Sequence, residues 1–348
     1  MDTCQLLAHS VPSLPILRGM PAPVCPRCRG ILQNLGKPGL NCRRCSHLFP
    51  LVAGFPDLRL SSDRYMDLSS ERVRAERLRL LEPDTDLDAL ANAYYSMTDD
   101  VLDHRRARFL RHISGAEARG EALARRLPRQ GRVLEIGCGT GGLLVASARS
   151  GLSIVGVDIA SRWLVVARRR LTDQRLTVPL LAAEAERLPW PDCSFDTIVA
   201  DSVLEHLDDP ARAFAEWRRV VRPGGRLIVW SPNRFTVATD PHVGLWGIGA
   251  LPRKWVRPYL RLRGRSDWPP QTLSALEARS MAVRTGWQKA NVSAPPVSKA
   301  WARTRPLRER WPLLGYEFAR GVPFAKRLLC TFGPLWELQA TAGVIDPS

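Results

Sequence analysis

The 348-residue sequence predicts an α/β fold built on a doubly wound parallel sheet, preceded by a small unit of different composition. Two observations lead to this prediction. Between residues 132 and 230, short apolar segments rich in Val and Ile alternate with segments whose apolar residues recur at helical spacing. Ahead of them, residues 21–60 contain two Cys-X-X-Cys pairs, which set this stretch apart from the rest of the chain.

The cysteine pairs predict a zinc ribbon over residues 21–60. The four cysteines are Cys25 with Cys28 and Cys42 with Cys45, and 13 residues separate the two pairs. They supply the four thiolates that a tetrahedral structural zinc requires, and with four cysteines bound the metal keeps no open position for catalysis. Because so short a unit buries little apolar surface, we expect the metal to supply its folding energy.

A glycine-rich turn in residues 132–142 is the most informative segment of the larger unit. An apolar strand runs there into three alternate glycines, Gly137, Gly139 and Gly141, and a helix follows. Such a turn lets the backbone approach a ligand closely and directs a helix N-terminus at it. A second strand ends in Asp158, about 20 residues further on, where a carboxylate can accept both hydroxyls of a ribose. The segment therefore predicts a nucleotide-like ligand.

The remaining elements complete a seven-stranded sheet. Predicted strands cover residues 180–184, 197–200, 226–230, 288–293 and 336–341, and predicted helices cover residues 70–81, 101–127, 211–221 and 272–285. The predicted organisation is an N-terminal tail (1–20), the ribbon (21–60), a helical linker followed by a loop and lid (61–100), and the α/β domain (101–348) with insertions near 232–271 and 295–333.

Six motifs in this order and spacing resemble the class I S-adenosylmethionine-dependent methyltransferases, in the small-molecule branch typified by ubiquinone and menaquinone biosynthesis enzymes. The matching segments are residues 135–141, 157–158, 184–190, 194–199, 203–207 and 220–227. The resemblance extends over roughly residues 101–292 and implies a Rossmann-like seven-stranded fold with S-adenosylmethionine as the cofactor. The end of the ribbon, residues 47–58, resembles small zinc-ribbon proteins that activate RNA and protein methyltransferases. It implies a structural or substrate-presenting role.

The resemblance also implies which residues contact the cofactor. The glycine turn would bind the methionine moiety, Asp158 the ribose, and Glu184 with Ala185 the adenine. Glu184 departs from the usual aspartate, but its longer side chain is expected to reach an exocyclic amine. The other implied contacts, in or beside the matching motifs, are Glu135, Ile159 and Asp201.

An aromatic residue just before the helix at 101–127 often closes over the cofactor in the resembling family. This makes Tyr94 or Tyr95 a lid candidate, and the alternative is that both side chains pack in the core.

Methyl transfer from a sulfonium needs mainly alignment of the acceptor, and a base only where the acceptor loses a proton. After the fourth strand, Asp201, Glu205 and His206 are candidates, of which the imidazole has the most suitable pKa. The alternative for His206 is a packing role. Asp240 and His242, in the first insertion, are the other candidates for catalysis.

Charge and hydropathy restrict the partners. The net charge of +17 is uneven, because residues 231–348 hold 18 basic and seven acidic residues. Within them, residues 243–263 and 311–329 interleave Trp and Leu with Arg. Three interpretations stay open for these stretches: a cap over an apolar acceptor pocket, contact with an anionic membrane surface, and RNA binding.

No apolar run approaches the roughly 18 residues of a membrane span, and the N-terminus lacks a signal-peptide pattern. The expected location is cytoplasmic, and peripheral at the membrane if the insertions contact lipid. Four cysteines outside the pairs (Cys4, Cys138, Cys193 and Cys330) are scattered singly, which predicts no disulfide framework.

Together these features predict methyl transfer from S-adenosylmethionine to a hydrophobic small molecule or to a lipid- or carrier-linked acceptor. An rRNA or tRNA methyltransferase is the first alternative. It is favoured by the basic flanks and by a resemblance to ribosomal guanine methyltransferases that carry an N-terminal zinc module. A non-catalytic, cofactor-binding scaffold is the second.

Overall fold

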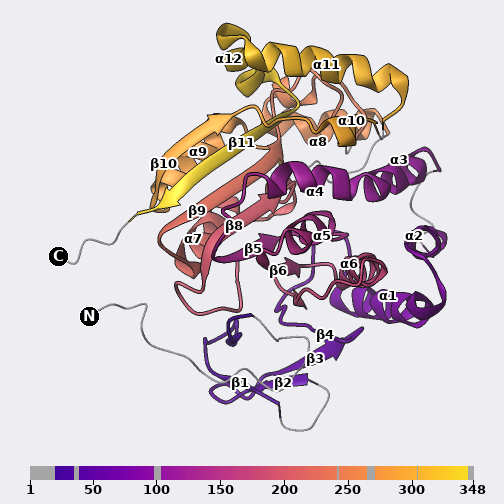
Figure 1. Cartoon of the computed structure of the whole chain (residues 1–348), viewed down its shortest axis with the longest axis vertical. Helices are drawn as coiled ribbons and strands as arrows, with labels where there is room; N and C mark the ends of the chain where they lie inside the picture. The colour runs from indigo at the N-terminus through magenta and orange to yellow at the C-terminus, as the bar shows by residue number, and fades with distance from the viewer. Residues whose placement is uncertain are drawn as a thin grey trace.

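A seven-stranded sheet forms the centre of the molecule (Figure 1). The computed structural model describes residues 20–34, 39–97, 103–240, 243–264, 271–303 and 305–343. The strand order is β10-β11-β9-β8-β5-β6-β7, and β11 alone is antiparallel to its neighbours. The strands are β5 (Arg132–Ile136), β6 (Ser153–Asp158), β7 (Leu180–Ala182), β8 (Phe195–Asp201), β9 (Val221–Pro232), β10 (Trp287–Ser293) and β11 (Leu335–Ala342). The predicted α/β fold with seven strands is confirmed.

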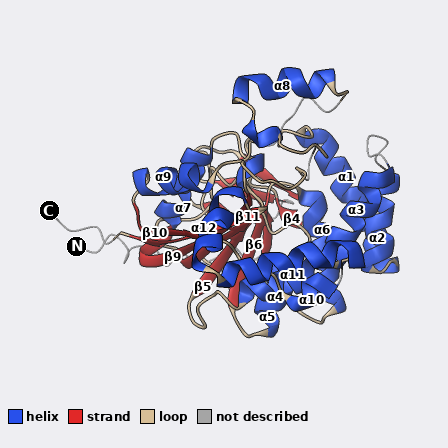
Figure 2. Ribbon diagram, turned by 90° about the horizontal axis from the view of Figure 1, so that it is seen from above, coloured by secondary structure: helices blue, strands red, loops and turns tan. Residues whose placement is uncertain are grey.

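Helices cover both faces of this sheet, as Figure 2 shows from above. One face packs against α4 (Ala116–Ala124), α5 (Gly142–Arg149) and α6 (Ser161–Asp173), and the other against α7 (Pro210–Val220) and α9 (Ala275–Arg284). The apolar strands are buried on both sides, as expected of a mostly parallel sheet. Each face therefore has its own apolar core.

The two cysteine pairs lie in a separate antiparallel sheet of four short strands. These are β1 (Leu32–Gln33), β2 (Gly39–Cys42), β3 (Leu48–Val52) and β4 (Phe55–Pro56). This sheet rests on the larger unit: the Val24 N–H donates to the Pro189 carbonyl at 2.9 Å, and the Trp190 indole N–H donates to the Pro21 carbonyl at 3.2 Å. Leu32, Leu40 and Phe49 belong to the apolar cluster on the α7 and α9 face of the large sheet, whereas Val52 and Phe55 belong to the cluster on the other face.

The linker is more helical than the sequence predicts. The predicted helix at 70–81 is found as α1 (Leu68–Leu81), but the expected loop after it holds the 3-10 turn η2 (Glu82–Asp84) and the helix α2 (Leu87–Ser96). The carboxylate of Asp86 caps α2 by accepting the Ala89 N–H at 2.7 Å. Leu90 and Ala91 of α2 are buried against the large unit, and this tertiary contact stabilises a helix that local composition does not indicate.

The single helix predicted over residues 101–127 is two helices. α3 (Asp103–Ser114) ends just before Gly115, and α4 begins at Ala116. Gly115 is the N-cap residue of α4 and separates the two helices. The apolar periodicity continues across the break, which is why the sequence pattern does not reveal it.

Both insertions attach at the edge of the sheet where the parallel strands end. The first follows β9 and contains η4 (Ile248–Ala250) and α8 (Arg253–Leu262). The second contains α10 (Lys299–Arg303), α11 (Leu307–Gly321) and α12 (Pro323–Phe332), and the chain then enters β11 with Leu335 opposite Pro232, the last residue of β9. In Figure 1, α11 and α12 lie at the end of the molecule opposite β1 and β2.

The cysteines outside the pairs are not alike. Cys138 and Cys330 are free thiols, whereas Cys193 is disulfide-bonded. The sequence did not predict this bond, because the spacing of single cysteines does not tell which of them meet in space. Across the described ranges, every helix is too short or too polar to cross a lipid bilayer.

Candidate cofactor site and candidate metal centre

The glycine turn after β5 has the conformation that its sequence predicts. Gly137, Gly139 and Gly141 all have positive φ angles of 68°, 48° and 78°, a backbone region that side chains disfavour. A Cβ atom on Gly137 would also overlap the side chain of Val203. The turn is tied to β6, since the N–H groups of Gly137 and Cys138 both donate to the Val157 carbonyl. Gly141 is the N-cap of α5, so the N-terminus of this helix opens at the turn.

Asp158 lies beside the turn at the end of β6, 8% exposed. Its Oδ2 accepts the Gly139 N–H and its Oδ1 accepts the Ala160 N–H, each at 2.8 Å. Burial raises the pKa of this carboxyl, and the two backbone donors partly oppose the rise. Each oxygen keeps a second lone pair, so the carboxylate can still accept the hydroxyls of a ribose.

Three further carboxylates surround the turn. Glu135, Asp201 and Glu205 lie at or near the ends of β5 and β8. Burial, together with the charges of Asp201 and Asp158, raises the pKa of Glu135 well above its usual range. Its Oε2 has no hydrogen-bond partner within the described residues. A buried, unpartnered carboxylate favours a cationic ligand.

Arg119 of α4 is the cation that offsets part of this negative charge. Its guanidinium forms a two-pronged pair with Asp201, with Nε 2.6 Å from Oδ2. This contact was not predicted from the sequence, because the two residues are far apart along the chain. Asp201 is therefore paired, whereas Glu135 is left for a ligand. S-adenosylmethionine carries a sulfonium and an ammonium group, and an unpaired carboxyl beside the turn fits a cationic ligand of this kind.

The predicted adenine side of the site is in contact with the segment that follows the small sheet. Oε1 of Glu184 accepts the N–H groups of Leu60 and Ser61 at 2.6 and 2.7 Å. The guanidinium of Arg59 donates to the carbonyl of Ile159 at 2.6 Å. These partners were missed from the sequence, since backbone donors leave no motif. Ala185 is buried beside Glu184.

Comparison with known proteins agrees with this geometry. A family model described as "Methyltransferase domain" matches residues 134–229. The chain is 32% identical over 179 residues to a ubiquinone biosynthesis O-methyltransferase of Mesorhizobium japonicum, covering 51% of this chain and 68% of the relative. The chain belongs to the class I S-adenosylmethionine-dependent methyltransferases.

Other relatives of this methyltransferase are matched over less of their length. A ubiquinone/menaquinone biosynthesis C-methyltransferase of Bordetella avium is 40% identical over 124 residues, 35% of this chain and 48% of the relative. The chain thus spans about half the length of several curated relatives that it matches. A solved methyltransferase structure from Thermotoga maritima is similar at 19% identity with a TM-score of 0.43, covering 68% of this chain and 94% of that one.

The two lid candidates lie inside the methyltransferase core. Tyr94 and Tyr95 are 6% and 5% exposed. The ring of Tyr94 lies 4.6 Å from that of Trp163 on α6, and the ring of Tyr95 stacks on Phe109 of α3. The packing alternative accounts for both positions. A contact of either ring with the cofactor stays a prediction.

His206 follows β8 in the 3-10 turn η3 (Leu204–His206). Its Nδ1 lies 2.7 Å from the hydroxyl of Tyr65, and its Nε2 lies 4.0 Å from Oε1 of Glu205. Burial raises the pKa of Glu205 to about 8, with a further rise from Asp201. The structure thus brings a phenol, an imidazole and a weakly acidic carboxyl together. Tyr65 carries no sequence signal that would have identified it.

The other candidates for catalysis are in the first insertion. Asp240 is buried, and its Oδ1 accepts the Val243 N–H at 3.1 Å while its backbone pairs with Leu245 and Gly244. The carboxylate therefore closes a turn. His242 lies outside the described residues. A chemical role for either stays a prediction.

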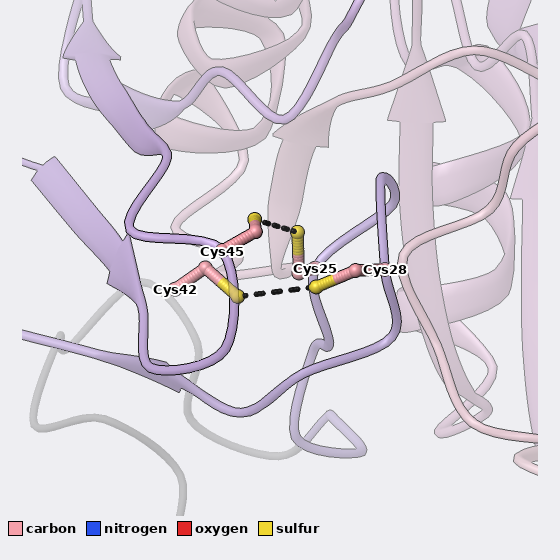
Figure 3. Close-up of side chains that lie close together, drawn as sticks. All are labelled: Cys25, Cys28, Cys42 and Cys45. Atoms are coloured by element: carbon pink, nitrogen blue, oxygen red, sulfur yellow. Dashed lines mark hydrogen bonds between the residues drawn. The ribbon is translucent and has the colours of Figure 1, made fainter.

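The candidate metal centre is a cluster of four thiols (Figure 3). The sulfur atoms of Cys25, Cys28, Cys42 and Cys45 all lie within 4.8 Å of one another, and the closest pairs are 3.4 and 3.7 Å apart. Sulfurs bound to one zinc at about 2.3 Å are separated by about 3.8 Å, so the donor set fits a tetrahedral ion.

The backbone around the four thiols leaves space for them and places N–H groups near their sulfur atoms. A Cβ on Gly30 would lie 2.9 Å from the sulfur of Cys42, so only glycine fits beside the thiols. The Arg44 N–H points to the same sulfur at 3.4 Å. The His47 N–H lowers the pKa of Cys45 to about 7, whereas burial raises the pKa of Cys25 and of Cys28.

Proposed function

We propose that this methyltransferase transfers a methyl group from S-adenosylmethionine to a small apolar acceptor, such as a lipid- or carrier-linked molecule. The observation that carries the proposal is the position of the two insertions. Both attach at the carboxyl ends of the parallel strands, at the same edge of the sheet as the glycine turn after β5. In open α/β sheets this edge is where ligands bind. The first insertion adds a buried apolar cluster of Val243, Leu245, Ile248 and Leu260, which supports an apolar acceptor.

The cofactor supplies an activated methyl group on a sulfonium. For this chain we infer that the turn at Gly137–Gly141 holds the methionine part and that Asp158 holds the ribose. Glu184 with Ala185 would contact the adenine, and Glu135 would balance the positive charge. The matching relatives and the unpartnered Glu135 carboxylate support these roles. Ile159 and Asp201 would then line the same site.

His206 is the candidate base that the geometry supports best. The Tyr65 hydroxyl fixes the orientation of its ring, and Glu205 lies near its other nitrogen. An imidazole in this position can accept a proton from an acidic acceptor. Glu205, with a pKa of about 8, is a second group able to exchange a proton near neutral pH. Asp240 and His242 remain candidates in the insertion.

We further infer that Cys25, Cys28, Cys42 and Cys45 hold a structural zinc ion and that residues 21–60 form a ribbon around it. Four cysteines leave no position for a water or a substrate. The ribbon precedes a linker (61–100) and the catalytic domain (101–348). Metal analysis of the purified protein tests this directly, and the expected result is one zinc per chain. A metal-free chain with the same melting temperature would contradict it.

The test of methyl transfer uses labelled cofactor. The protein is incubated with S-adenosylmethionine that carries a tritiated methyl group and with a cell extract divided into organic-solvent, small-molecule, protein and RNA fractions. We expect label in the organic fraction. Label in the RNA fraction would support the alternative of an RNA methyltransferase. Cofactor binding without label in any fraction would support a scaffold.

A further inference from the structure

Helix α11 has its apolar side facing solvent. Leu307, Trp311, Leu314 and Phe318 recur at helical spacing, and each is more than 60% exposed. A helix on the surface of a globular protein normally buries such a stripe. Here the arrangement is reversed.

The opposite side of α11 holds the helix to the protein through polar groups. The Tyr316 hydroxyl donates to the Pro295 carbonyl at 2.8 Å, and Arg320 donates to the Ala294 carbonyl at 3.1 Å. Oε1 of Glu317 accepts the Val297 N–H, and Arg310 donates to the Arg305 carbonyl. These contacts fix the rotation of the helix about its axis. The outward direction of the apolar stripe is therefore part of the fold.

Helix α12, which packs against α11, also exposes large apolar side chains. Phe324, Leu328 and Phe332 are 73%, 45% and 46% exposed, and they are separated by one turn each. Gly321 and Val322 join the two helices, which pack against each other at the end of the molecule shown at the top of Figure 1. We call the exposed residues of α11 and α12 the apolar hairpin surface. Apolar residues scattered singly are normal on the surface of a soluble protein, but a series of them along two packed helices is not.

Cations adjoin this surface. Lys326 and Arg327 are exposed on α12, whose sequence contains no acidic residue. Helix α8 also exposes Trp255 and Leu262 among Lys254 and several arginines, without an acidic residue, although Figure 2 shows it apart from α11 and α12. Aromatic and aliphatic side chains beside Lys and Arg are typical of helices that lie in the interface of an anionic bilayer.

We propose that α11 and α12 dock this methyltransferase on an anionic lipid bilayer, with the apolar hairpin surface inserted among the lipids. Charge complementarity selects the occupant, because the exposed Lys326 and Arg327 of α12 would lie at the level of the lipid phosphates. The apolar hairpin surface is attached to the edge of the sheet where we propose that the methyl acceptor binds. Asn233, which follows β9, donates to the Cys330 and Thr331 carbonyls at the end of α12. An apolar acceptor dissolved in the bilayer would reach the catalytic edge without crossing water.

The test is flotation of the full-length protein with vesicles. One set is phosphatidylcholine alone, and the other contains roughly one third phosphatidylglycerol. Trp311→Glu combined with Phe318→Glu places two charges on the apolar hairpin surface. Leu276→Glu is the matched control, because Leu276 is 75% exposed on α9, away from this surface. All the changed side chains are exposed, so the fold should tolerate them, and unchanged S-adenosylmethionine binding checks this.

We expect the wild type and Leu276→Glu to float with the anionic vesicles and the double variant to bind them at least about tenfold more weakly. Lys326→Glu with Arg327→Glu should weaken binding in a salt-dependent manner. Equal flotation of the double variant would overturn the proposal. The proposal would also be overturned if the wild type were a dimer and the double variant a monomer, because a second copy of the chain would then cover the apolar hairpin surface. RNA binding that the double variant abolishes, with no binding to vesicles, would overturn it too.

Discussion

Replacing Glu205 by Gln should stabilise the methyltransferase, and the gain should grow with pH. The Glu205 side chain is fully buried in η3. Its Oε2 has only the Ser231 hydroxyl at 3.4 Å, and its Oε1 has no hydrogen-bond partner within the described residues. Burial raises the pKa of this carboxyl from 4.5 to about 8, and the charge of Asp201 adds to the rise. Glutamine has nearly the same shape and no charge to bury.

The magnitude follows from proton linkage. Below pH 4.5 the carboxyl is protonated in both the unfolded and the folded chain, so it does not oppose folding. As pH rises toward 8, the unfolded chain releases the proton and the folded one keeps it, which lowers the free energy of unfolding by about 1.4 kcal/mol per pH unit. The loss reaches about 3 kcal/mol at pH 7 and about 5 kcal/mol above pH 8. The Glu205→Gln variant escapes this loss.

The assay is urea denaturation of the wild type and the variant at pH values from 4 to 9. Their free energies of unfolding should nearly coincide at pH 4 and diverge toward pH 8. Glu277→Gln is a control of opposite sign. Partial burial raises the pKa of Glu277, but hydrogen bonds from Ser274 and Arg253 outweigh it and lower the pKa. That variant should therefore lose stability above the pKa of the unfolded carboxyl. A difference between Glu205→Gln and the wild type that does not change with pH would refute the reasoning.

Three other predictions concern the cofactor site and the metal centre. Asp158→Ala should lower S-adenosylmethionine affinity at least about tenfold, because one charged hydrogen bond contributes about 1.5–3 kcal/mol; calorimetry beside the control Asp173→Ala measures this, and equal affinities would contradict the ribose assignment. Gly137→Ala should destabilise the fold by about 1–3 kcal/mol in urea, and more than Gly151→Ala, which has a similar φ but open space around it. Chelation should expose residues 21–60 to proteases, and continued protection without metal would refute the zinc proposal.

The parts of the site that the sequence predicted are those with a local cause. Three alternate glycines before a helix require positive φ angles, and two Cys-X-X-Cys pairs bring four thiols to one place. Asp158 could be predicted as well, because it ends a buried parallel strand, and in open α/β sheets ligands bind at the carboxyl ends of the strands. In each case the relevant partners are within a short stretch of chain or at the end of a strand.

The contacts that the sequence did not predict join distant segments. Tyr65 and His206 are 141 positions apart, and Leu60 is 124 positions from Glu184. Backbone N–H groups carry no sequence signature, so donors such as that of Leu60 can only be found in three dimensions. Helix α11 shows a second limit. Its apolar stripe is visible in the sequence, but periodicity alone does not tell whether the stripe faces the core or the solvent.

The segment from Asp57 to Tyr65 joins the unit that holds the four cysteines to the candidate cofactor site. Asp57 bridges to Ala182 at the edge of β7, the N–H groups after it hold Glu184, and the Tyr65 hydroxyl reaches His206. A buried pair of Asp57 with Arg59 anchors the start of this segment. The position of these groups depends on the small sheet before them, since β3 and β4 set where the chain leaves it. The segment after the small sheet therefore contacts two residues of the candidate site, and a chain that began after residue 67 would lose the contacts of Leu60 and Ser61 with Glu184 and of Tyr65 with His206.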